Sequence, residues 1–221
     1  SRIKAVSDRM ATCRDITFPK AAHEEGIPAG KDPELLPDPR SFKKRVGALL
    51  SVGGAMTKNW LAVMRPTMYE FSMSMGIDVV DMHEYHGAMA HEHVLGNEEQ
   101  MDRMRKMGQN IAAAVLADSE EERTKWRGEQ DGVCPVCHCD MLTVSPDRES
   151  AECPVCGIRG EFRVENGKLM VSFSEEEQRR SRLHWDGKLE HSTEIKTRAV
   201  GPGQIPDLKA RKAPYIGYAE K

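Results

Sequence analysis

The stretch Val46-Gly47-Ala48-Leu49-Leu50-Ser51-Val52-Gly53-Gly54 decides the fold class. A short, largely apolar run that ends in two glycines predicts a buried strand of a parallel sheet. A second run, Ile77-Asp78-Val79-Val80-Asp81-Met82, predicts another such strand. Residues 57–75 between them predict a helix, because apolar side chains recur there at helical spacing. Its predicted buried stripe comprises Trp60, Met64, Met68, Phe71 and Met75. Strands that alternate with helices favour an α/β fold.

The segments on either side extend this pattern. A helix is predicted near the start of the chain, where Ile3, Val6, Met10 and Cys13 follow 3-4-3 spacing. Residues 16–43 are rich in proline and glycine and predict a long loop. A histidine-rich loop is expected at 83–96, after which Asn97 can cap a further helix. One face of that helix is predicted to carry Met101, Met104, Gly108, Ile111 and Val115.

The number of strands limits what the chain can form by itself. Two strands are too few for a parallel sheet, which needs several strands and cover on both faces. We therefore expect residues 1–118 to be the second half of a doubly wound parallel sheet. Its first half would be on another chain, removed or absent. Residues 119–132 are then a linker, 133–175 a small module and 176–221 an extended C-terminal arm that wraps a neighbour.

Composition restricts the class of protein. The 221 residues are 39% hydrophobic and 30% charged, with a formal net charge of -3. These values are typical of a globular protein and give no reason to expect nucleic acid as a partner. No apolar run is long enough for a membrane span, and Ser1-Arg2-Ile3-Lys4 is not a secretory signal. Six cysteines, four of them in CxxC pairs, favour metal chemistry in a reducing compartment, which we expect to be the cytoplasm.

Two cysteine pairs are the strongest local motif. Cys134-Pro-Val-Cys137 and Cys153-Pro-Val-Cys156 are separated by fifteen residues, so four thiolates can converge on one tetrahedral ion. Asn166-Gly167 lies between two alternating segments and predicts a hairpin with a type I′ turn. The pairs and hairpin together resemble a zinc ribbon. The alternative is an iron site of rubredoxin type, which would carry one electron. Cys139 is either a replacement ligand or a spare thiol.

The stretch 46–82 resembles the C-terminal half of flavodoxin-like NAD(P)H-dependent FMN reductases and their iron-sulfur flavoprotein relatives. In that family a strand ends in a Gly-Gly turn, a long helix follows, and a glycine precedes the next strand, as in Met75-Gly76-Ile77-Asp78-Val79-Val80 here. Residues 1–10 resemble the helix after the family's second flavin-contacting loop. The resemblance implies FMN as cofactor and NAD(P)H as co-substrate. The family's phosphate-binding loop, which follows its first strand, is not in this sequence.

Two groups of candidate site residues follow from these observations. The segment Gly53-Gly54-Ala55-Met56 lies at the carboxyl end of a strand, where open α/β sheets bind ligands, and the resemblance places it beside the flavin ring. His83, Tyr85 and His86 follow the second strand, so they are candidates for proton transfer to a small-molecule substrate. The histidines are also possible metal ligands, although the loop has no HExxH motif.

The sequence favours an oligomeric FMN-dependent oxidoreductase, or a subunit or fragment of one, with an attached zinc ribbon. Two other classes stay open. One is a non-enzymatic interaction module, although the ribbon has no Lys/Arg cluster between its cysteine pairs that would favour nucleic acid. The other is a flavin-free hydrolase that uses the histidine loop, or Ser1 as an N-terminal nucleophile.

Overall fold

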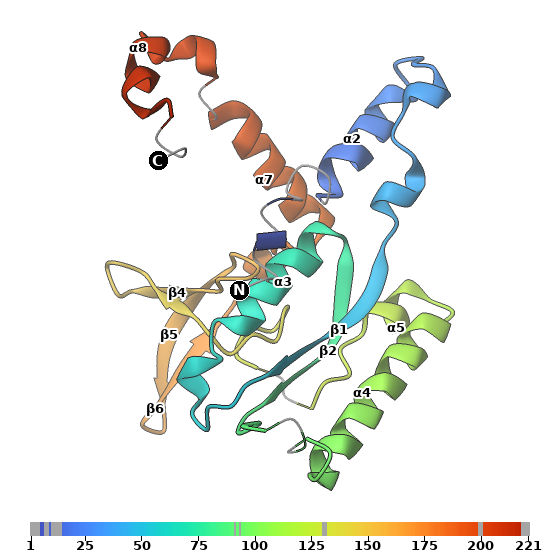
Figure 1. The fold of residues 1–221 in the computed structure, drawn as a ribbon, viewed down its shortest axis with the longest axis vertical. Helices are drawn as coiled ribbons and strands as arrows, with labels where there is room; N and C mark the ends of the chain where they lie inside the picture. Colours follow the sequence, from blue (N-terminus) through green and yellow to red (C-terminus); the bar gives the residue numbers. More distant parts are fainter. Residues whose placement is uncertain are drawn as a thin grey trace.

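The computed structural model describes residues 5, 6, 9, 15–90, 92, 94–129, 132–198 and 201–217. Two sheets organise them (Figure 1). Strands β1 (Arg45–Val52) and β2 (Ile77–Tyr85) form a parallel pair, and four short strands form an antiparallel sheet in the order β3-β4-β5-β6. The predicted α/β class with a parallel sheet is therefore confirmed. Ser1 and most of the helix predicted around Ile3 to Cys13 lie outside the described residues.

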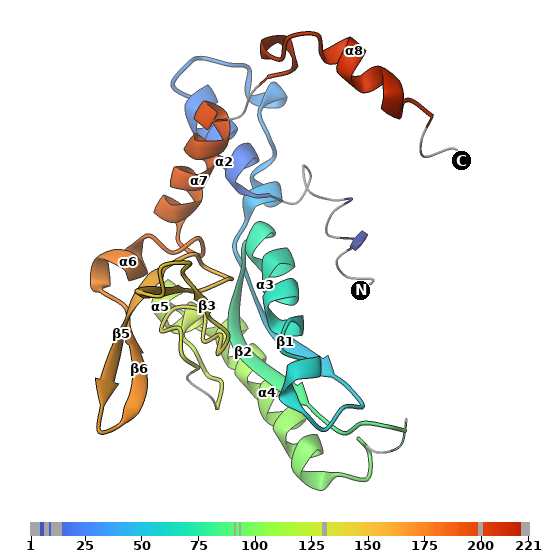
Figure 2. The same ribbon diagram turned by 90° about the vertical axis from the view of Figure 1, so that its left-hand side faces the viewer.

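A βαβ unit builds the parallel pair. Helix α3 (Met64–Ser74) connects β1 to β2, and α4 (Glu98–Leu116) follows β2. In both views the two strands lie between α3 and α4 (Figures 1 and 2). The strands pair from Arg45 opposite Ile77 to Val52 opposite Tyr85, with one register shift between Gly47 and Ala48. Their carboxyl ends therefore meet at one edge, as the sequence predicted for a ligand-binding edge.

Two boundaries in this unit differ from those predicted. A single 3-10 turn, η3 (Lys58–Trp60), comes first, and α3 starts only at Met64. The helix starts late because Pro66 belongs in a first turn, where no intrahelical N–H bond is lost. Trp60 is consequently not part of a buried stripe and is 73% exposed. Strand β2 continues to Tyr85, so His83 and Tyr85 lie in the strand and not in a loop.

The segment predicted as a loop at 16–43 is partly helical. It contains α2 (Thr17–Gly26) and the 3-10 turns η1 (Pro33–Leu35) and η2 (Pro39–Phe42). The loop prediction was wrong here because Pro19 falls in the first turn of α2, where proline is tolerated. The alanines and glutamates that follow Pro19 are good helix formers. Gly26 then ends the helix, close to the Leu36 side chain.

Helix α4 is capped as predicted, but it turns a different face to the sheet. Asn97 Oδ1 accepts the Gln100 backbone N–H at 3.1 Å. The buried face is polar as well as apolar and consists of Arg103, Met107, Asn110 and Ala114. This face is chosen because Asp81 of β2 is fully buried and bonds to Arg103 and Asn110. The predicted apolar face is only partly covered, and Val115 is 54% exposed.

Residues 133–175, called here the cysteine module, contain the antiparallel sheet. Its strands are β3 (Thr143–Val144), β4 (Ser150–Glu152), β5 (Arg159–Glu165) and β6 (Lys168–Ser172). Asn166 and Gly167 both have positive φ, 51° and 74°, which confirms the predicted type I′ hairpin. The module is not isolated, because its cysteines share one core with Leu49, Met68, Tyr69 and Met82.

Short helices complete the chain. They are α5 (Glu120–Thr124), α6 (Glu175–Arg179), α7 (Trp185–Arg198) and α8 (Leu208–Lys212), with 3-10 turns η4 (Pro202–Gln204) and η5 (Ala213–Tyr215). Helices α7 and α8 extend away from both sheets (Figures 1 and 2). Lys20 of α2 lies over the Trp185 ring, 4.1 Å from its centroid. No described helix has the length and apolar character that a bilayer span requires.

Candidate functional site

The loops that follow β1 and β2 are hydrogen-bonded to one another. The Gly53 N–H donates to Tyr85 O at 3.0 Å, and the Ala88 N–H donates to Gly53 O at 3.0 Å. Farther out, the Gly87 N–H donates to Ala55 O at 3.1 Å. We call residues 53–63 and 86–97 the edge loops. The structure thus brings the predicted cofactor residues, 53–56, next to the predicted catalytic residues at the end of β2.

The edge loops expose backbone and apolar side chains. Gly54 is exposed, and a Cβ atom built on it would come no closer than 3.7 Å to any neighbour. Gly53 differs, because its missing Cβ leaves room for the Leu61 side chain. Met56 and Met89, one in each edge loop, are 72% and 69% exposed. Trp60, in the same loop as Met56, is 73% exposed. Exposed apolar side chains that gather at one edge of a protein usually mark a binding surface.

The three predicted catalytic side chains divide between the two faces of β2. His83 Nε2 lies 2.6 Å from Gln100 Oε1 of α4. Tyr85 is two residues further along the strand and shares that face, because side chains alternate. Glu84 faces α3 instead, where its carboxylate lies 3.2 Å from Arg65 Nε. His86 is on the Glu84 side, with Nε2 3.7 Å from Glu84 Oε2. The roles of these residues stay predictions.

A buried ionic network connects the edge to the cysteine module. Arg65 and Glu84 are almost fully buried, and Arg65 also lies 3.7 Å from Asp140. Asp140 pairs with Lys58 of the first edge loop. Burial raises the pKa of Asp140, but the Lys58 hydrogen bond and the Arg65 charge outweigh it and hold the pKa below its usual range. The carboxylate is therefore ionised at neutral pH and ties the module to the edge.

Two buried polar atoms at the edge have no hydrogen-bond partner among the described residues. They are His86 Nδ1 and Ser51 Oγ. Ser51 is opposite Glu84 in the strand register, so both atoms lie near the carboxyl ends of the strands. An unsatisfied buried polar atom costs about 1–3 kcal/mol, which a bound ligand or water can recover. His91 and His93 of the predicted histidine loop lie outside the described residues.

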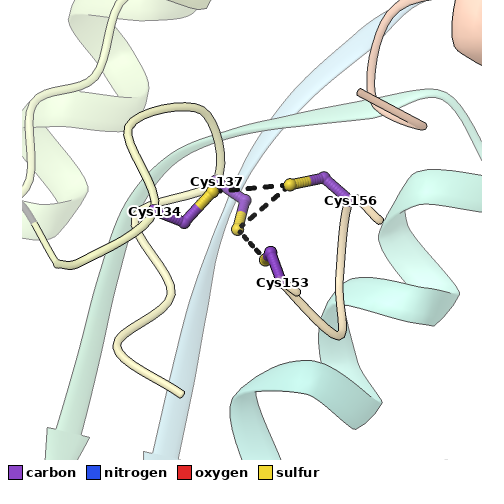
Figure 3. A group of neighbouring side chains, drawn as sticks. All are labelled: Cys134, Cys137, Cys153 and Cys156. Atoms are coloured by element: carbon purple, nitrogen blue, oxygen red, sulfur yellow. Dashed lines mark hydrogen bonds between the residues drawn. The ribbon is translucent and has the colours of Figure 1, made fainter. Parts of the chain in front are cut away.

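The four predicted metal ligands converge (Figure 3). The Sγ atoms of Cys134 and Cys156 are 3.4 Å apart, as are those of Cys137 and Cys153, and all four lie within 4.8 Å of one another. A tetrahedral zinc–thiolate site with Zn–S bonds of about 2.3 Å has S–S edges of about 3.8 Å. The described residues thus form a group that can hold a metal ion.

Both cysteine pairs have the same backbone geometry. The residue after each pair has positive φ, 56° at His138 and 71° at Gly157. Its N–H donates to the carbonyl of the first cysteine, at 3.0 Å to Cys134 and 2.9 Å to Cys153. All four ligand thiols are fully buried. Hydrogen bonds with the neighbouring thiols, Cys137 first, lower the pKa of Cys134 far below its usual range, and the hydrogen bond with Cys134 raises the pKa of Cys137 and of Cys156.

Sequence reasoning missed the residues that support the site. Arg65, Glu84 and Asp140 come from three separate parts of the chain, so no local spacing reveals their contact. Cys139 is fully buried but is not one of the four converging cysteines.

Comparison with known proteins supplies independent information. A flavone reductase of known structure superposes with a TM-score of 0.79, over 99% of this chain and 72% of that chain, at 25% sequence identity. Flavone synthase cfoJ of Aspergillus candidus is 32% identical over 187 residues, which are 83% of this chain and 56% of that protein. The chain therefore spans about half the length of this curated relative. No protein-family model matches the sequence.

Proposed function

We propose that the chain is part of an FMN-dependent oxidoreductase that passes reducing equivalents between NAD(P)H and a flat aromatic acceptor of the flavone class. The observation that carries the proposal is the pair of hydrogen-bonded edge loops at the carboxyl ends of β1 and β2. The names of the two similar proteins, a flavone reductase and a flavone synthase, support a redox reaction on such a molecule.

The residues present are compatible with one wall of a flavin site. The open side of Gly54 lets a planar ring approach the backbone closely, and Met56 and Ala55 supply apolar contact. His86 Nδ1 and Ser51 Oγ offer polar atoms that lack partners among the described residues. The bound flavin would supply the hydride or electron chemistry, while the protein binds, orients and provides protons. In this proposal the acceptor contacts His83, Tyr85 and His86, which provide the protons.

Completion of the sheet is part of the same proposal. Strand β1 pairs with β2 on one edge, and its other edge pairs with no described strand. The partly covered face of α4 adds exposed apolar surface at Val115 and Leu116. We infer that further parallel strands, from a partner chain or another copy, pair with β1 and cover this face. Those strands would bring the phosphate-binding loop, as in a flavodoxin-like doubly wound sheet.

For the cysteine module we propose a structural zinc ribbon. Four buried thiols leave no open position on the ion, which suits a structural role. The shared core with Tyr69 and Leu49 means that the ion would also stabilise the α3 side of the parallel pair. Iron in the same site is the alternative, and metal analysis distinguishes the two. Unpaired thiols of this kind are maintained in a reducing compartment, which favours the cytoplasm.

The test is an anaerobic assay of the natively purified protein with FMN, NADH or NADPH, and a flavone, followed by chromatography of the flavone. We expect consumption of the nicotinamide that depends on the flavone. His86→Ala and Tyr85→Phe should lower turnover by about 10²-fold or more if these groups transfer protons. His191→Ala is the matched control, because His191 is exposed on α7. Nicotinamide consumption at the same rate with and without the flavone would contradict the proposal.

A further inference from the structure

A cavity lies at the amino end of the parallel strands, opposite the edge loops. Its volume is about 220 Å³, and it is bounded by the start of β2, the C-terminal part of α3 and the first turn of α7. The ionisable side chains that line it are Lys44, Tyr69, Asp78, His184 and Lys188. The edge loops contribute no residue to it. The cavity is therefore separate from the candidate flavin site.

Lys188 is the side chain that distinguishes this cavity. Its ammonium donates to Met73 O at 3.0 Å, near the end of α3. No described carboxylate pairs with it, since Asp15 and Asp78 act on it only at longer range. Burial lowers the pKa of Lys188 to about 8, and the Lys44 charge adds to this effect. A substantial fraction of the side chain is therefore a neutral amine near physiological pH.

Two other ionisable side chains line the same cavity, Asp78 and His184. Burial raises the pKa of Asp78, although Lys44 and Lys188 oppose that shift. Burial lowers the pKa of His184, so its imidazole is mostly neutral at pH 7. The Met73 carbonyl holds the nitrogen in place in both protonation states, because even the neutral amine keeps N–H groups to donate. The lone pair of the neutral amine is then available to a molecule in the cavity.

We propose that Lys188 is a covalent attachment site for small aldehydes or ketones that enter this cavity. The amine nitrogen attacks the carbonyl carbon, and the C–N bond forms as the carbonyl oxygen becomes a hydroxyl group. Loss of that hydroxyl as water leaves an imine on Lys188. The step consumes no oxidant or reductant. Asp78 and His184 are the groups placed to carry the protons it moves.

Reductive trapping tests the proposal on the intact protein. The protein is incubated with glyoxylate and sodium cyanoborohydride, which reduces each imine to a stable secondary amine, and labelled peptides are quantified by mass spectrometry. Lys196 is an internal control, because it is exposed on the same helix, α7. Lowering the pKa from 10.5 to about 8 raises the neutral fraction at pH 7 by about two orders of magnitude. We therefore expect Lys188 to label at least about tenfold faster than Lys196.

Two further readouts separate a formed site from chance reactivity. Labelling of Lys188 should rise with a midpoint near pH 8, which is set by burial and by the charges of Asp15, Asp78 and Lys44. In concentrated urea the preference for Lys188 over Lys196 should disappear, since the cavity is lost. Equal labelling of the two lysines in the folded protein, or a preference that persists in urea, would overturn the proposal. Neither readout depends on flavin binding or on redox activity.

Discussion

Replacement of Arg103 by alanine is expected to destabilise the chain strongly. Arg103 donates to both Asp81 carboxylate oxygens, at 3.0 and 2.5 Å, and to Met82 O at 3.0 Å. The Asp81 side chain is fully buried and that of Arg103 is 5% exposed. Arg103→Ala leaves the Asp81 carboxylate with the Asn110 amide, at 2.8 Å, as its remaining described partner. A buried charge is thereby left without a counter-charge.

The magnitude follows from the cost of such an uncompensated charge. Removing one partner of a buried ion pair costs about 3–5 kcal/mol. For a chain of this size each kcal/mol lowers Tm by roughly 2–4 °C, so the variant should melt about 6–20 °C below the parent. Because Asp81 lies on β2, the loss should also loosen the contact of α4 with that strand.

Urea unfolding followed by tryptophan fluorescence measures the change directly. Arg105→Ala is the matched control, since Arg105 is on the same helix, is exposed and pairs with Asp102 alone among the described residues. Its effect should stay within about 0.5 kcal/mol. A loss below about 1 kcal/mol for Arg103→Ala would refute the argument, because it would mean that Asp81 is neither charged nor desolvated in the fold.

Three other predictions concern the metal, the backbone and pH. Metal analysis should find one ion per chain, and the variant Cys156→Ser should lose both this ion and the cooperative unfolding of the cysteine module. A parent protein whose unfolding is the same with and without metal would contradict this prediction. Gly76→Ala should cost about 1–3 kcal/mol, because Gly76 has φ of 64° and its Cβ would lie 2.7 Å from Ile16 Cδ1. Gly108→Ala, in an open position of α4, should instead gain about 0.5–1 kcal/mol, and equal signs for the two would be evidence against the geometry. Lys188 has a pKa of about 8 in the folded chain, whereas an ordinary lysine has a pKa of 10.5. Between these two values the unfolded chain therefore binds more protons than the folded chain. The free energy of unfolding should consequently rise with pH from about 8 to 10.5. Urea midpoints at pH 8 and 10 check this, and Lys188→Met should remove the rise.

Local patterns in the sequence predicted the local structure well. Both strands, the Asn97 cap and the Asn166-Gly167 turn depend on neighbouring residues, and the structure has all of them. The convergence of the four cysteines was predictable for the same reason, since each pair is a short turn. The start of α3 was not, because an apolar spacing continued through Trp60 although the helix begins four residues later.

Contacts between distant residues explain what the sequence did not reveal. The face that α4 buries is set by Asp81, whose need for Arg103 and Asn110 outweighs the apolar pattern of the helix. The Arg65–Glu84–Asp140 network joins three elements far apart in the chain. Lys188 is an ordinary lysine in sequence, and its burial depends on tertiary contacts such as its hydrogen bond to Met73 O of α3.

The most direct test of the central claim is the visible absorption spectrum of the natively purified protein, recorded before and after addition of FMN. The account predicts the two absorption bands of oxidised flavin, with saturation at one flavin per chain. It also predicts that a bulky side chain at the open position, Gly54→Trp, abolishes those bands while leaving the metal content unchanged. A colourless protein that gains no bound flavin when FMN is added, although its sheet is completed by its natural partner, would contradict the account.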